Sequence, residues 1–315
     1  MKELHCPYCD SKHIAPWGFK NPITGESMRF RCRECNRTFV KYPINRKSYA
    51  RDEEIKQEIL KRTVKKSVSS GFQAVALFDS HLLPNVTPHV SHELAMQYVI
   101  DTKPELIVYG GDLLDFSCIS SWNKNRPLLI ENQRYDEAIE MGRKEMGRLR
   151  KACPNSKIVF IEGNHEDRVA RWVEAIPALE GKVNFIEDMK FADEGIEAIP
   201  FGGVYKHGHL AYLHGVYYNK YYARSTLEQM GDNCIFGHAH KMQIWTQRLH
   251  FDTEPHIAIG CPCLTDVDPA WKRGKPTNFL NGFAIIEYKN DSDFSAYIAV
   301  IINGSFTYGG HTWSI

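Results

Sequence analysis

Groups that bind metals or transfer protons follow several apolar segments of this 315-residue chain, at the points where those segments end. A single histidine or aspartate in such a place is usually a hydrogen-bonded structural residue. Here the pattern recurs after five segments, and in α/β sheets that edge is where ligands bind. The residues are Asp79 and His81, Asp112 and Asp115, Asn164 with His165 and Glu166, His214, and His238 with His240.

Such a cluster of polar groups would be strongly destabilising without compensation, and a pair of divalent cations removes the penalty. Mixed nitrogen and oxygen donors suit Mn²⁺, Fe²⁺ or Zn²⁺ better than the all-oxygen sites of Mg²⁺ or Ca²⁺. The sequence therefore predicts a site for two metal ions, with Mn²⁺ favoured and Fe²⁺ or Zn²⁺ as alternatives.

The elements that must position these groups are short apolar strands and a few helices. The β-branched and aromatic runs predict strands, and helical spacing predicts helices near 89–102, 130–152, 166–175 and 219–230. The early half alternates strand and helix, whereas the late half is strand after strand, which indicates an α/β fold of two sheets packed face to face with helices outside. The predicted strands are 72–78, 105–110, 157–162, 209–214, 233–237, 242–249, 256–260, 282–288 and 294–302.

The ordered blocks "DSH", "GGDLLD", "GNHE", "HG" and "GHAH" resemble the calcineurin-like metallophosphoesterase family over residues 71 to about 290. The resemblance implies a four-layer α/β/β/α sandwich with a two-metal site at the sheet edge. It implies that the first metal is held by Asp79, His81, Asp112 and His240. The second would be held by the shared Asp112 with Asn164, His214 and His238, and His165 would be the catalytic histidine.

The chemistry explains these residue types. The two oxygens of Asp112 let one carboxylate bridge two ions, and a water between them attacks phosphorus as hydroxide. Asn164 supplies a neutral oxygen, which limits negative charge where a phosphate must approach. His165 can protonate the leaving oxygen or stabilise its charge.

Two further residues of the "GNHEDR" stretch are candidates. Glu166 could orient His165 as a hydrogen-bond acceptor, or it could be a carboxylate at a helix N-terminus. Arg168 resembles an arginine that holds a phosphate oxygen in the protein phosphatase branch. That branch also has Asp-Arg-Gly after its "GD" motif, whereas Phe116 and Ser117 follow Asp115 here, so half of the arginine clamp is missing.

Other residues near the predicted site have weaker patterns. His207 and His209 compete with His214 as ligands, but their place on the strand favours structural or substrate-facing roles. Segment 217–229 could flank the site, with Lys220 and Arg224 near a phosphate backbone, although aromatics at helical spacing are more often core. The remaining cysteines, Cys118, Cys153, Cys234, Cys261 and Cys263, are interpreted as buried thiols.

Cys6, Cys9, Cys32 and Cys35 form two CxxC pairs 22 residues apart. Two such pairs give tetrahedral sulfur ligation suited to one structural Zn²⁺, and the segment resembles a zinc ribbon. Cations alternate with aromatics there, as a nucleic-acid surface would require, although a purely structural module is the alternative. The interleaved residues are Arg29, Arg31, Arg33, Arg37, Lys41, Arg46 and Lys47 with Phe30, Phe39 and Tyr42.

Charge is divided unevenly along the chain. Residues 1–68 contain 16 Lys and Arg against 8 Asp and Glu, whereas the remaining residues contain 23 against 30. A basic module joined to an acidic one favours a polyanionic partner, although charge alone is equally consistent with a solvated surface. The predicted organisation is a zinc ribbon at 1–45, a charged linker helix at 46–70 and a metallophosphoesterase domain at 71–315.

Composition favours a soluble protein without a membrane partner. No apolar run approaches the roughly 20 residues that cross a bilayer, and "MKELHCPYCD" lacks the apolar stretch of a secretory signal. Nine cysteines in such a chain predict thiols and metal ligands in the cytoplasm.

These features together predict a dinuclear metal-dependent phosphoric ester hydrolase. The leading hypothesis is a phosphodiesterase or nuclease that the ribbon directs to nucleic acid, with DNA favoured. The alternatives are a phosphomonoesterase acting on proteins or small molecules, and an inactive nucleic-acid-binding adaptor. The sequence does not distinguish DNA from RNA, cleavage polarity or oligomeric state.

Overall fold

The computed structural model describes residues 5–19, 28–40, 71–123, 125, 127–248, 254–269, 272, 274–289 and 293–315. The chain separates into two compact units, residues 1–68 and 69–315. The predicted linker helix at 46–70 lies outside the described residues, so it stays a prediction, as do the exact limits of the predicted ribbon.

The first unit is a small antiparallel sheet. Its strands are β1 (Ile14–Phe19), β2 (Met28–Cys32) and β3 (Thr38–Val40), in that spatial order. The first CxxC pair precedes β1, and the second begins at the end of β2 and continues into the turn before β3. The unit therefore brings both cysteine pairs to one end of its sheet.

The second unit contains a six-stranded sheet in the order β14-β13-β4-β5-β6-β7. The four strands from β4 to β7 are parallel, and β13 and β14 run antiparallel at the edge. The bounds are β4 (Phe72–Leu77), β5 (Leu106–Tyr109), β6 (Lys157–Ile161), β7 (Ile196–Ile199), β13 (Gly282–Tyr288) and β14 (Phe294–Val300).

A five-stranded sheet follows the order β11-β12-β10-β9-β8, with β9, β10 and β12 parallel and the edge strands antiparallel. Its strands are β8 (Tyr205–His207), β9 (Leu210–Leu213), β10 (Cys234–Phe236), β11 (Gln243–Gln247) and β12 (His256–Gly260). A hairpin of β15 (Ser305–Tyr308) and β16 (His311–Ser314) ends the chain.

Among the described residues the helices are few and mostly short. They are α2 (Val90–Thr102), α3 (Pro127–Ile130), α4 (Tyr135–Ala152), α5 (Asp167–Ala175), α6 (Phe185–Met189) and α7 (Tyr222–Met230). Three-residue 3₁₀ turns occur at η1 (Ser117–Ile119), η2 (Ser121–Asn123) and η3 (Pro177–Leu179). None of the helices in the described part of the chain is long and apolar enough to cross a membrane.

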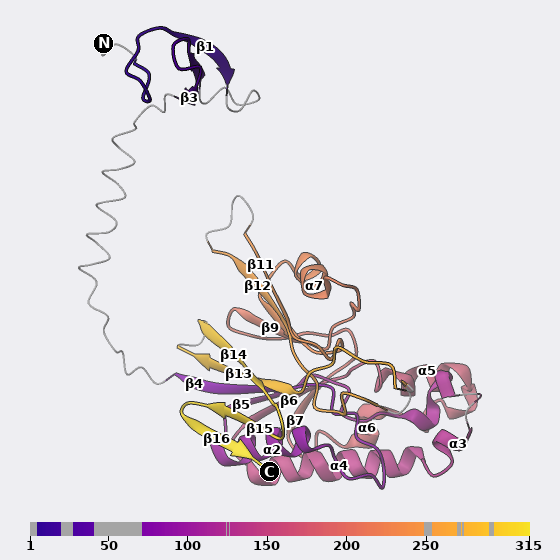
Figure 1. The fold of residues 1–315 in the computed structure, drawn as a ribbon. Coiled ribbons are helices and arrows are strands. Elements are labelled where there is room, and N and C mark those ends of the chain that lie inside the picture. Colours follow the sequence, from indigo (N-terminus) through magenta and orange to yellow (C-terminus); the bar gives the residue numbers. More distant parts are fainter. Residues whose placement is uncertain are drawn as a thin grey trace. The chain divides into compact units, whose positions relative to one another are not determined.

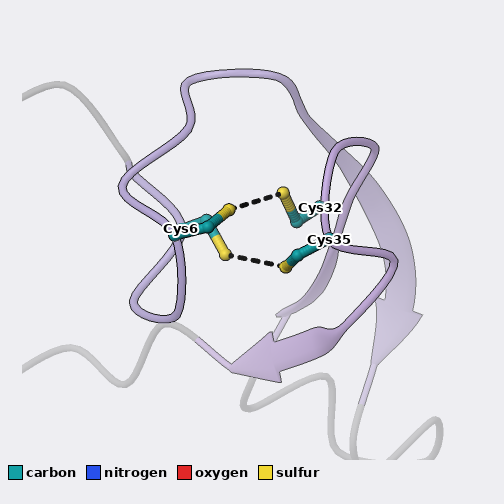
Figure 2. A group of neighbouring side chains, drawn as sticks. Cys6, Cys32 and Cys35 are labelled. Carbon is teal, nitrogen blue, oxygen red and sulfur yellow. Dashed lines mark hydrogen bonds between the residues drawn. The ribbon is translucent and has the colours of Figure 1, made fainter.

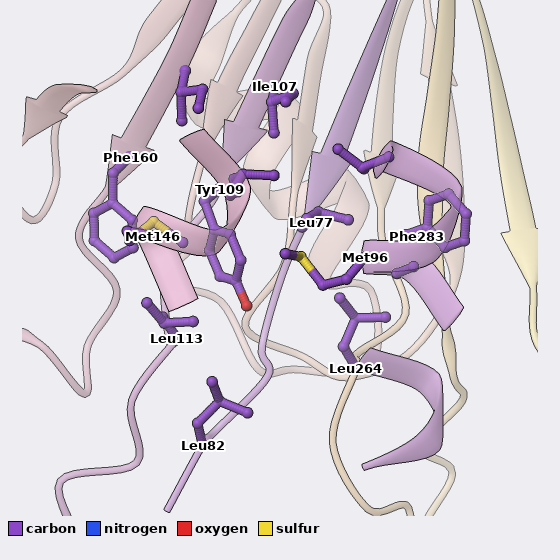
Figure 3. Packing of buried hydrophobic residues seen from close by; sticks show 14 of the residues in the cluster. Leu77, Leu82, Met96, Ile107, Tyr109, Leu113, Met146, Phe160, Leu264 and Phe283 are labelled. Atoms are coloured by element: carbon purple, nitrogen blue, oxygen red, sulfur yellow. The ribbon is translucent and has the colours of Figure 1, made fainter. Parts of the chain in front are cut away.

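Side chains along the central strands point alternately to the two faces of the sheet, and both faces are buried, which explains why these strands are apolar at nearly every position. On β5, Ile107 and Tyr109 belong to one buried cluster, whereas Leu106 and Val108 belong to another. The first cluster includes residues of α2 and α4, and Figure 3 shows part of it. The second cluster joins the six-stranded sheet to strands β9, β10 and β12. Both faces of the sheet are therefore buried, which is the arrangement that parallel strands require.

A third apolar cluster lies on the other face of the five-stranded sheet. There Ala211, Phe236 and Ala258 contact Tyr222 and Leu227 of α7. In Figure 1, α2 and α4 lie on one side of the strands and α7 lies on the opposite side. The second unit is thus a mixed α/β structure, as the sequence predicts, with helices on either side of its strands.

Several elements differ from the sequence expectation. The helix predicted over 130–152 begins at Tyr135, because residues 127–130 form the separate helix α3 and a turn follows it. Strands β7, β8, β15 and β16 and helix α6 were not predicted. Each has at most five residues, and such segments are too short for apolar periodicity to identify them.

Candidate metal centre

The predicted ligand groups converge at the carboxyl ends of strands from both sheets of the second unit. β4, β5 and β6 lead into the first half of the set, and β9 and β10 lead into the second half. Three groups of potential ligand atoms have all their members within 4.8 Å of one another. They are Asp79 with His81 and His240, His81 with Asp112 and His165, and Asp112 with His214 and His238.

The first group joins the end of β4 to the end of β10. Nε2 of His81 lies 3.0 Å from Nε2 of His240, and the latter lies 3.7 Å from Oδ1 of Asp79. That oxygen of Asp79 is buried and has no hydrogen-bond partner. Two ring nitrogens facing each other beside an unpartnered carboxylate oxygen fit a bound cation, which would accept all three lone pairs.

The group of Asp112, His214 and His238, called the second group from here on, lies around the side-chain oxygen of Asn164. This Oδ1 lies 2.7 Å from Nδ1 of His238 and 3.0 Å from Nε2 of His214. Nδ1 of His214 also lies 2.9 Å from the carbonyl oxygen of Gly110, and a hydrogen bond there leaves the Nε2 lone pair facing the cluster. A backbone acceptor that fixes the ring in this way is typical of metal-binding histidines.

Asp112 borders both groups. Its Oδ2 lies 3.6 Å from Nε2 of His81 and 3.5 Å from Nε2 of His214. Burial opposes ionisation of this carboxyl, but the neighbouring His214 and His165 hold its pKa well below the usual range. Burial raises the pKa of Asp79 to about 7. The protein alone therefore does not fully compensate the charge of the Asp79 carboxylate, and a bound cation would do so.

Five of the predicted ligands have a left-handed backbone. A positive φ is uncommon for residues other than glycine and costs on the order of 1–3 kcal/mol in each case. Such strain persists only where the surrounding structure enforces it, and it concentrates at functional sites. The φ angles are 55° at Asp79, 46° at His81, 52° at Asp112, 67° at His238 and 57° at His240.

His165 lies beside the first group. Its backbone N–H donates to Oδ1 of Asp112 (2.8 Å), and its ring Nδ1 lies 2.7 Å from the carbonyl oxygen of Asp115. Its ring packs edge-on against His81, with centroids 4.3 Å apart. Burial lowers the pKa of His165 to about 3, so in this surrounding its imidazole is neutral.

Arg168 lies against the ring of His165 and the backbone of Asp115. Its Nη1 donates to the carbonyl oxygen of Asp115 (2.7 Å), and its Nη2 donates to Nε2 of His165 (2.8 Å). The guanidinium thus holds the imidazole of His165 instead of pointing freely at a phosphate. Because Nε2 accepts from Arg168, the Nδ1 of His165 carries the proton and donates it to Asp115.

Of the two roles considered for Glu166, the structure fits the carboxylate at a helix N-terminus, because Glu166 directly precedes α5. The Glu166 carboxylate is buried and accepts three backbone N–H groups, from Asp112 (2.8 Å), Gly163 (2.8 Å) and Leu114 (3.2 Å). Burial raises its pKa to about 7. Glu166 therefore fastens the loop after β5 to the loop after β6, and it acts on the site through backbone position.

A buried polar chain behind the site was not predicted. Oγ of Ser80, between two predicted ligands, lies 2.9 Å from Nδ1 of His92 and also contacts the hydroxyl of Tyr109. Nε2 of His92 lies 3.0 Å from Oε1 of Glu145. Ser80, His92 and Glu145 are all buried. This chain connects the loop after β4 to helices α2 and α4, so it fixes the position of that loop.

His207 and His209, which the sequence offers as alternatives to His214 as ligands, lie in different surroundings. The ring of His207 packs edge-on against the stacked rings of Phe72 and Tyr288, at centroid distances of 4.8 Å to each. Nδ1 of His209 lies 3.8 Å from Oδ1 of Asp293. Neither belongs to a group of potential metal ligands among the described residues, which fits the structural roles favoured by the sequence.

The four cysteines of the first unit form a separate cluster. Sγ of Cys6 lies 3.5 Å from Sγ of Cys35, and Sγ of Cys9 lies 3.6 Å from Sγ of Cys32. Figure 2 shows the sulfur atoms turned toward one another. Backbone N–H groups of Cys35 and Glu34 lower the pKa of Cys32 to about 6, which favours a thiolate there, whereas desolvation and the other thiols raise the pKa of Cys9 to about 12. The cluster is thus positioned to hold one metal ion.

The exposed aromatic side chains of the first unit differ from those expected. Phe30 and Phe39 stack on each other across β2 and β3, with centroids 5.9 Å apart. Trp17 and Tyr8 are instead exposed, and Arg31 lies 4.4 Å from the Trp17 ring centroid. The predicted Lys41, Tyr42, Arg46 and Lys47 lie outside the described residues.

The structure thus defines a mixed α/β protein with a two-part His/Asp/Asn cluster and a separate four-cysteine cluster. No family model matches the chain. It is 22% identical over 231 residues to the "Gene 54 protein" of Mycobacterium phage L5, an alignment that covers 69% of this chain and 90% of the relative. Over 233 residues it is also 22% identical to the "Gene 54 protein" of Mycobacterium phage D29, with the same coverage.

Proposed function

We propose that the second unit is a four-layer calcineurin-like metallophosphoesterase that hydrolyses phosphodiesters with two divalent metal ions. The observation that carries this proposal is the position of Asp112, whose Oδ2 borders both the His81 side and the His214 side of the cluster. With donors on both sides of its carboxylate, Asp112 would be able to contribute to holding two ions at once. The three apolar clusters, two against helices and one between sheets, support the layer order.

Different residues of the site would contribute to different parts of hydrolysis. Two bound cations would activate a water and neutralise the charge of the phosphate. Asn164 contributes a neutral oxygen, so it adds no negative charge where the phosphate approaches. His165, held beside the first group by the backbone of Asp115 and by Arg168, would act on the leaving oxygen once its Nε2 exchanges the contact with Arg168 for a proton. Because these groups are held on strand ends, their positions are fixed before the substrate binds.

The arrangement favours a diester over a monoester. The additional charge of a monoester calls for a cationic clamp, and Arg168 here already contacts Asp115 and His165.

The complete ligand set also disfavours an inactive adaptor. Relative turnover of bis-p-nitrophenyl phosphate and p-nitrophenyl phosphate separates the first two functions, and metal content separates the third, because an adaptor needs only the ion of the cysteine cluster.

Hydrolysis of bis-p-nitrophenyl phosphate in Mn²⁺ by the full chain tests the proposal. We expect Asp112→Asn to reduce turnover to background. Asp193→Asn, which removes a charge from an exposed aspartate, provides the control and should match the unmodified chain. Unchanged turnover in Asp112→Asn would overturn the assignment.

For the first unit we propose a zinc ribbon that binds nucleic acid, with DNA favoured. The sulfur separations of 3.5 and 3.6 Å are close to the roughly 3.8 Å expected of sulfurs 2.3 Å from a tetrahedral zinc ion. Exposed Trp17 beside Arg31 offers stacking and charge together. Cysteines that serve as thiols and metal ligands fit a reducing compartment such as the cytoplasm.

Deletion of residues 1–45 tests the role of the first unit. We expect salt-sensitive DNA binding to weaken, because phosphate contacts release counterions, while hydrolysis of bis-p-nitrophenyl phosphate stays the same. A chain with Arg31→Ala and Trp17→Ala in the intact ribbon should show the same loss. Equal DNA affinity in all three chains would make the ribbon a protein-contact module.

A further inference from the structure

An exposed tyrosine and a lysine lie next to the metal centre, outside the ligand set. Tyr218 follows β9 in the loop after His214, and 53% of its surface is exposed. Its ring centroid lies 6.1 Å from that of the predicted ligand His238, at an interplanar angle of 74°. Nζ of Lys241, the residue after the predicted ligand His240, lies 4.8 Å from the Tyr218 ring centroid.

The same combination occurs on the other histidine of the "GHAH" block. The ring of Phe279 lies 4.6 Å from that of His240, and Nζ of Lys272 lies 5.7 Å from the Phe279 ring. Phe279 is partly buried, so its ring mainly supports His240. An aromatic residue with a cation thus lies beside each of these two histidines, and the pair at Tyr218 is the more accessible.

Tyr217 packs against the third apolar cluster, but packing does not account for the other apolar side chains of the loop that carries Tyr218. Val216 and Tyr221 in the same loop are 52% and 51% exposed, and Nζ of Lys220 lies 5.1 Å from the Tyr221 ring. A single exposed apolar side chain is ordinary, but several together indicate a binding surface. A cation–π contact at an exposed site contributes only about 0.5–1 kcal/mol, so Lys241 and Tyr218 can readily exchange each other for a ligand.

We propose that the metal centre takes a single-stranded nucleic acid as its substrate, with an unpaired base stacked on Tyr218 and a neighbouring phosphate on Lys241. This inference rests on the proposed phosphodiesterase function and names its substrate class. A π-face with a cation beside it matches the alternating base and phosphate of an unpaired strand. In a duplex the bases already stack on each other, and extracting one costs a few kcal/mol.

The geometry also explains why the contact would help catalysis. The rings of Tyr218 and His238 are neighbours. A base stacked on Tyr218 would therefore keep the adjacent phosphodiester bond close to the metal centre. A small diester without a nucleobase gains nothing from such a contact. The ratio of turnover on an oligonucleotide to turnover on a small diester therefore reports this contact separately from the metal chemistry.

The test compares kcat/KM on single-stranded dT and rU oligonucleotides, their duplexes and bis-p-nitrophenyl phosphate, with the full chain in Mn²⁺. Because stacking of one base contributes about 1–3 kcal/mol, we expect Tyr218→Ala to lower the oligonucleotide to small-diester ratio by about 5- to 150-fold. Tyr218→Trp should keep the ratio, because it keeps the stacking surface. Lys241→Gln should lower it and weaken its salt dependence.

Tyr297→Ala is the matched control, because Tyr297 on β14 is 47% exposed and contacts Tyr308. Its ratio should equal that of the unmodified chain. Equal ratios for Tyr218→Ala and Tyr297→Ala, or duplexes cleaved as fast as single strands, would overturn the proposal. Absent turnover of every substrate would instead reject the phosphodiesterase function. Oligonucleotide affinity of the Asp112→Asn chain with and without Tyr218→Ala would then still show whether the strand contact exists.

Discussion

Oε2 of Glu166 accepts a hydrogen bond from the backbone N–H of Asp112 at 2.8 Å. The same oxygen accepts from Gly163 at 2.8 Å, and Oε1 accepts from Leu114 at 3.2 Å. One buried carboxylate thus connects the loop after β5 with the loop after β6. Because Asp112 borders both groups of ligands, Glu166 determines where the shared oxygen lies.

Glu166→Ala should therefore affect both stability and metal affinity. Three buried N–H groups would lose their acceptor, at about 1–3 kcal/mol each where no water replaces it. We expect the free energy of unfolding to fall by about 3 kcal/mol or more, and Mn²⁺ affinity to fall about 10- to 100-fold. Urea denaturation and calorimetric titration measure the two effects.

Glu174→Ala, at an exposed position of helix α5, which begins directly after Glu166, is the control and should change neither. A stable Glu166→Ala chain with normal Mn²⁺ affinity would contradict this role.

The shared position of Asp112 predicts how many ions each variant retains. Oδ2 of Asp112 borders both ligand groups, whereas His238 belongs to the second group alone. Asp112→Ala should lose about two ions per chain, and His238→Ala about one. Elemental analysis after gel filtration measures this, with the ion of the cysteine cluster as an internal reference. His311→Ala, at an exposed histidine, should lose none. Equal losses in Asp112→Ala and His238→Ala would mean that Asp112 does not bridge.

The clustering of the predicted ligands could be foreseen because each of them follows an apolar strand, and strand ends meet at one edge of a sheet. Asp79, Asn164 and His214 therefore needed no knowledge of the helices. The hydrogen bonds of Glu166 to three backbone N–H groups and of Arg168 to His165 were not predicted, because they depend on loop conformation. Glu166 accepts from the N–H of Asp112, a residue whose φ is 52°, and the sequence does not specify such an angle at a residue other than glycine.

The chain of polar residues behind the site gave no sequence signal either. His92 and Glu145 lie within α2 and α4, 53 positions apart, and each looks like an ordinary polar residue of a helix. Their pairing follows from the way both helices pack on the same face of the six-stranded sheet. Contacts that depend on packing between elements cannot be identified from the periodicity of one element.

This buried pair predicts a pH dependence of stability. Burial alone would raise the pKa of Glu145, but hydrogen bonds from His92 and Arg148 outweigh it, so the pKa lies below the ordinary value of 4.5. A lowered pKa in the folded state means that the stabilisation is present above pH 4.5 and is lost as the pH falls through the lowered value. We expect Glu145→Gln to reduce the free energy of unfolding by about 2 kcal/mol at pH 7.

The difference between Glu145→Gln and the unmodified chain should shrink as the pH falls below 4.5, because the carboxylate becomes protonated in both states. Urea denaturation from pH 3.5 to 7 measures it. Glu137→Gln, at an exposed residue in the first turn of α4, should follow the curve of the unmodified chain. A constant difference across the whole range would show that the Glu145 carboxylate adds no pH-dependent stability.

Substitution of Gly163 tests how closely the loop after β5 and the loop after β6 must approach each other. A Cβ added at this position would lie 2.2 Å from Oδ1 of Asp112 and 2.5 Å from its backbone nitrogen. Neither atom can move without displacing the shared ligand, so Gly163→Ala should reduce Mn²⁺ content and turnover of bis-p-nitrophenyl phosphate. Gly147 in α4 is the control, because an added Cβ would have its nearest neighbour at 3.8 Å. Gly147→Ala should retain activity and gain up to about 1 kcal/mol of stability, since alanine favours the helix. Normal metal content in Gly163→Ala would show that the loop after β6 can retreat without cost to the metal centre.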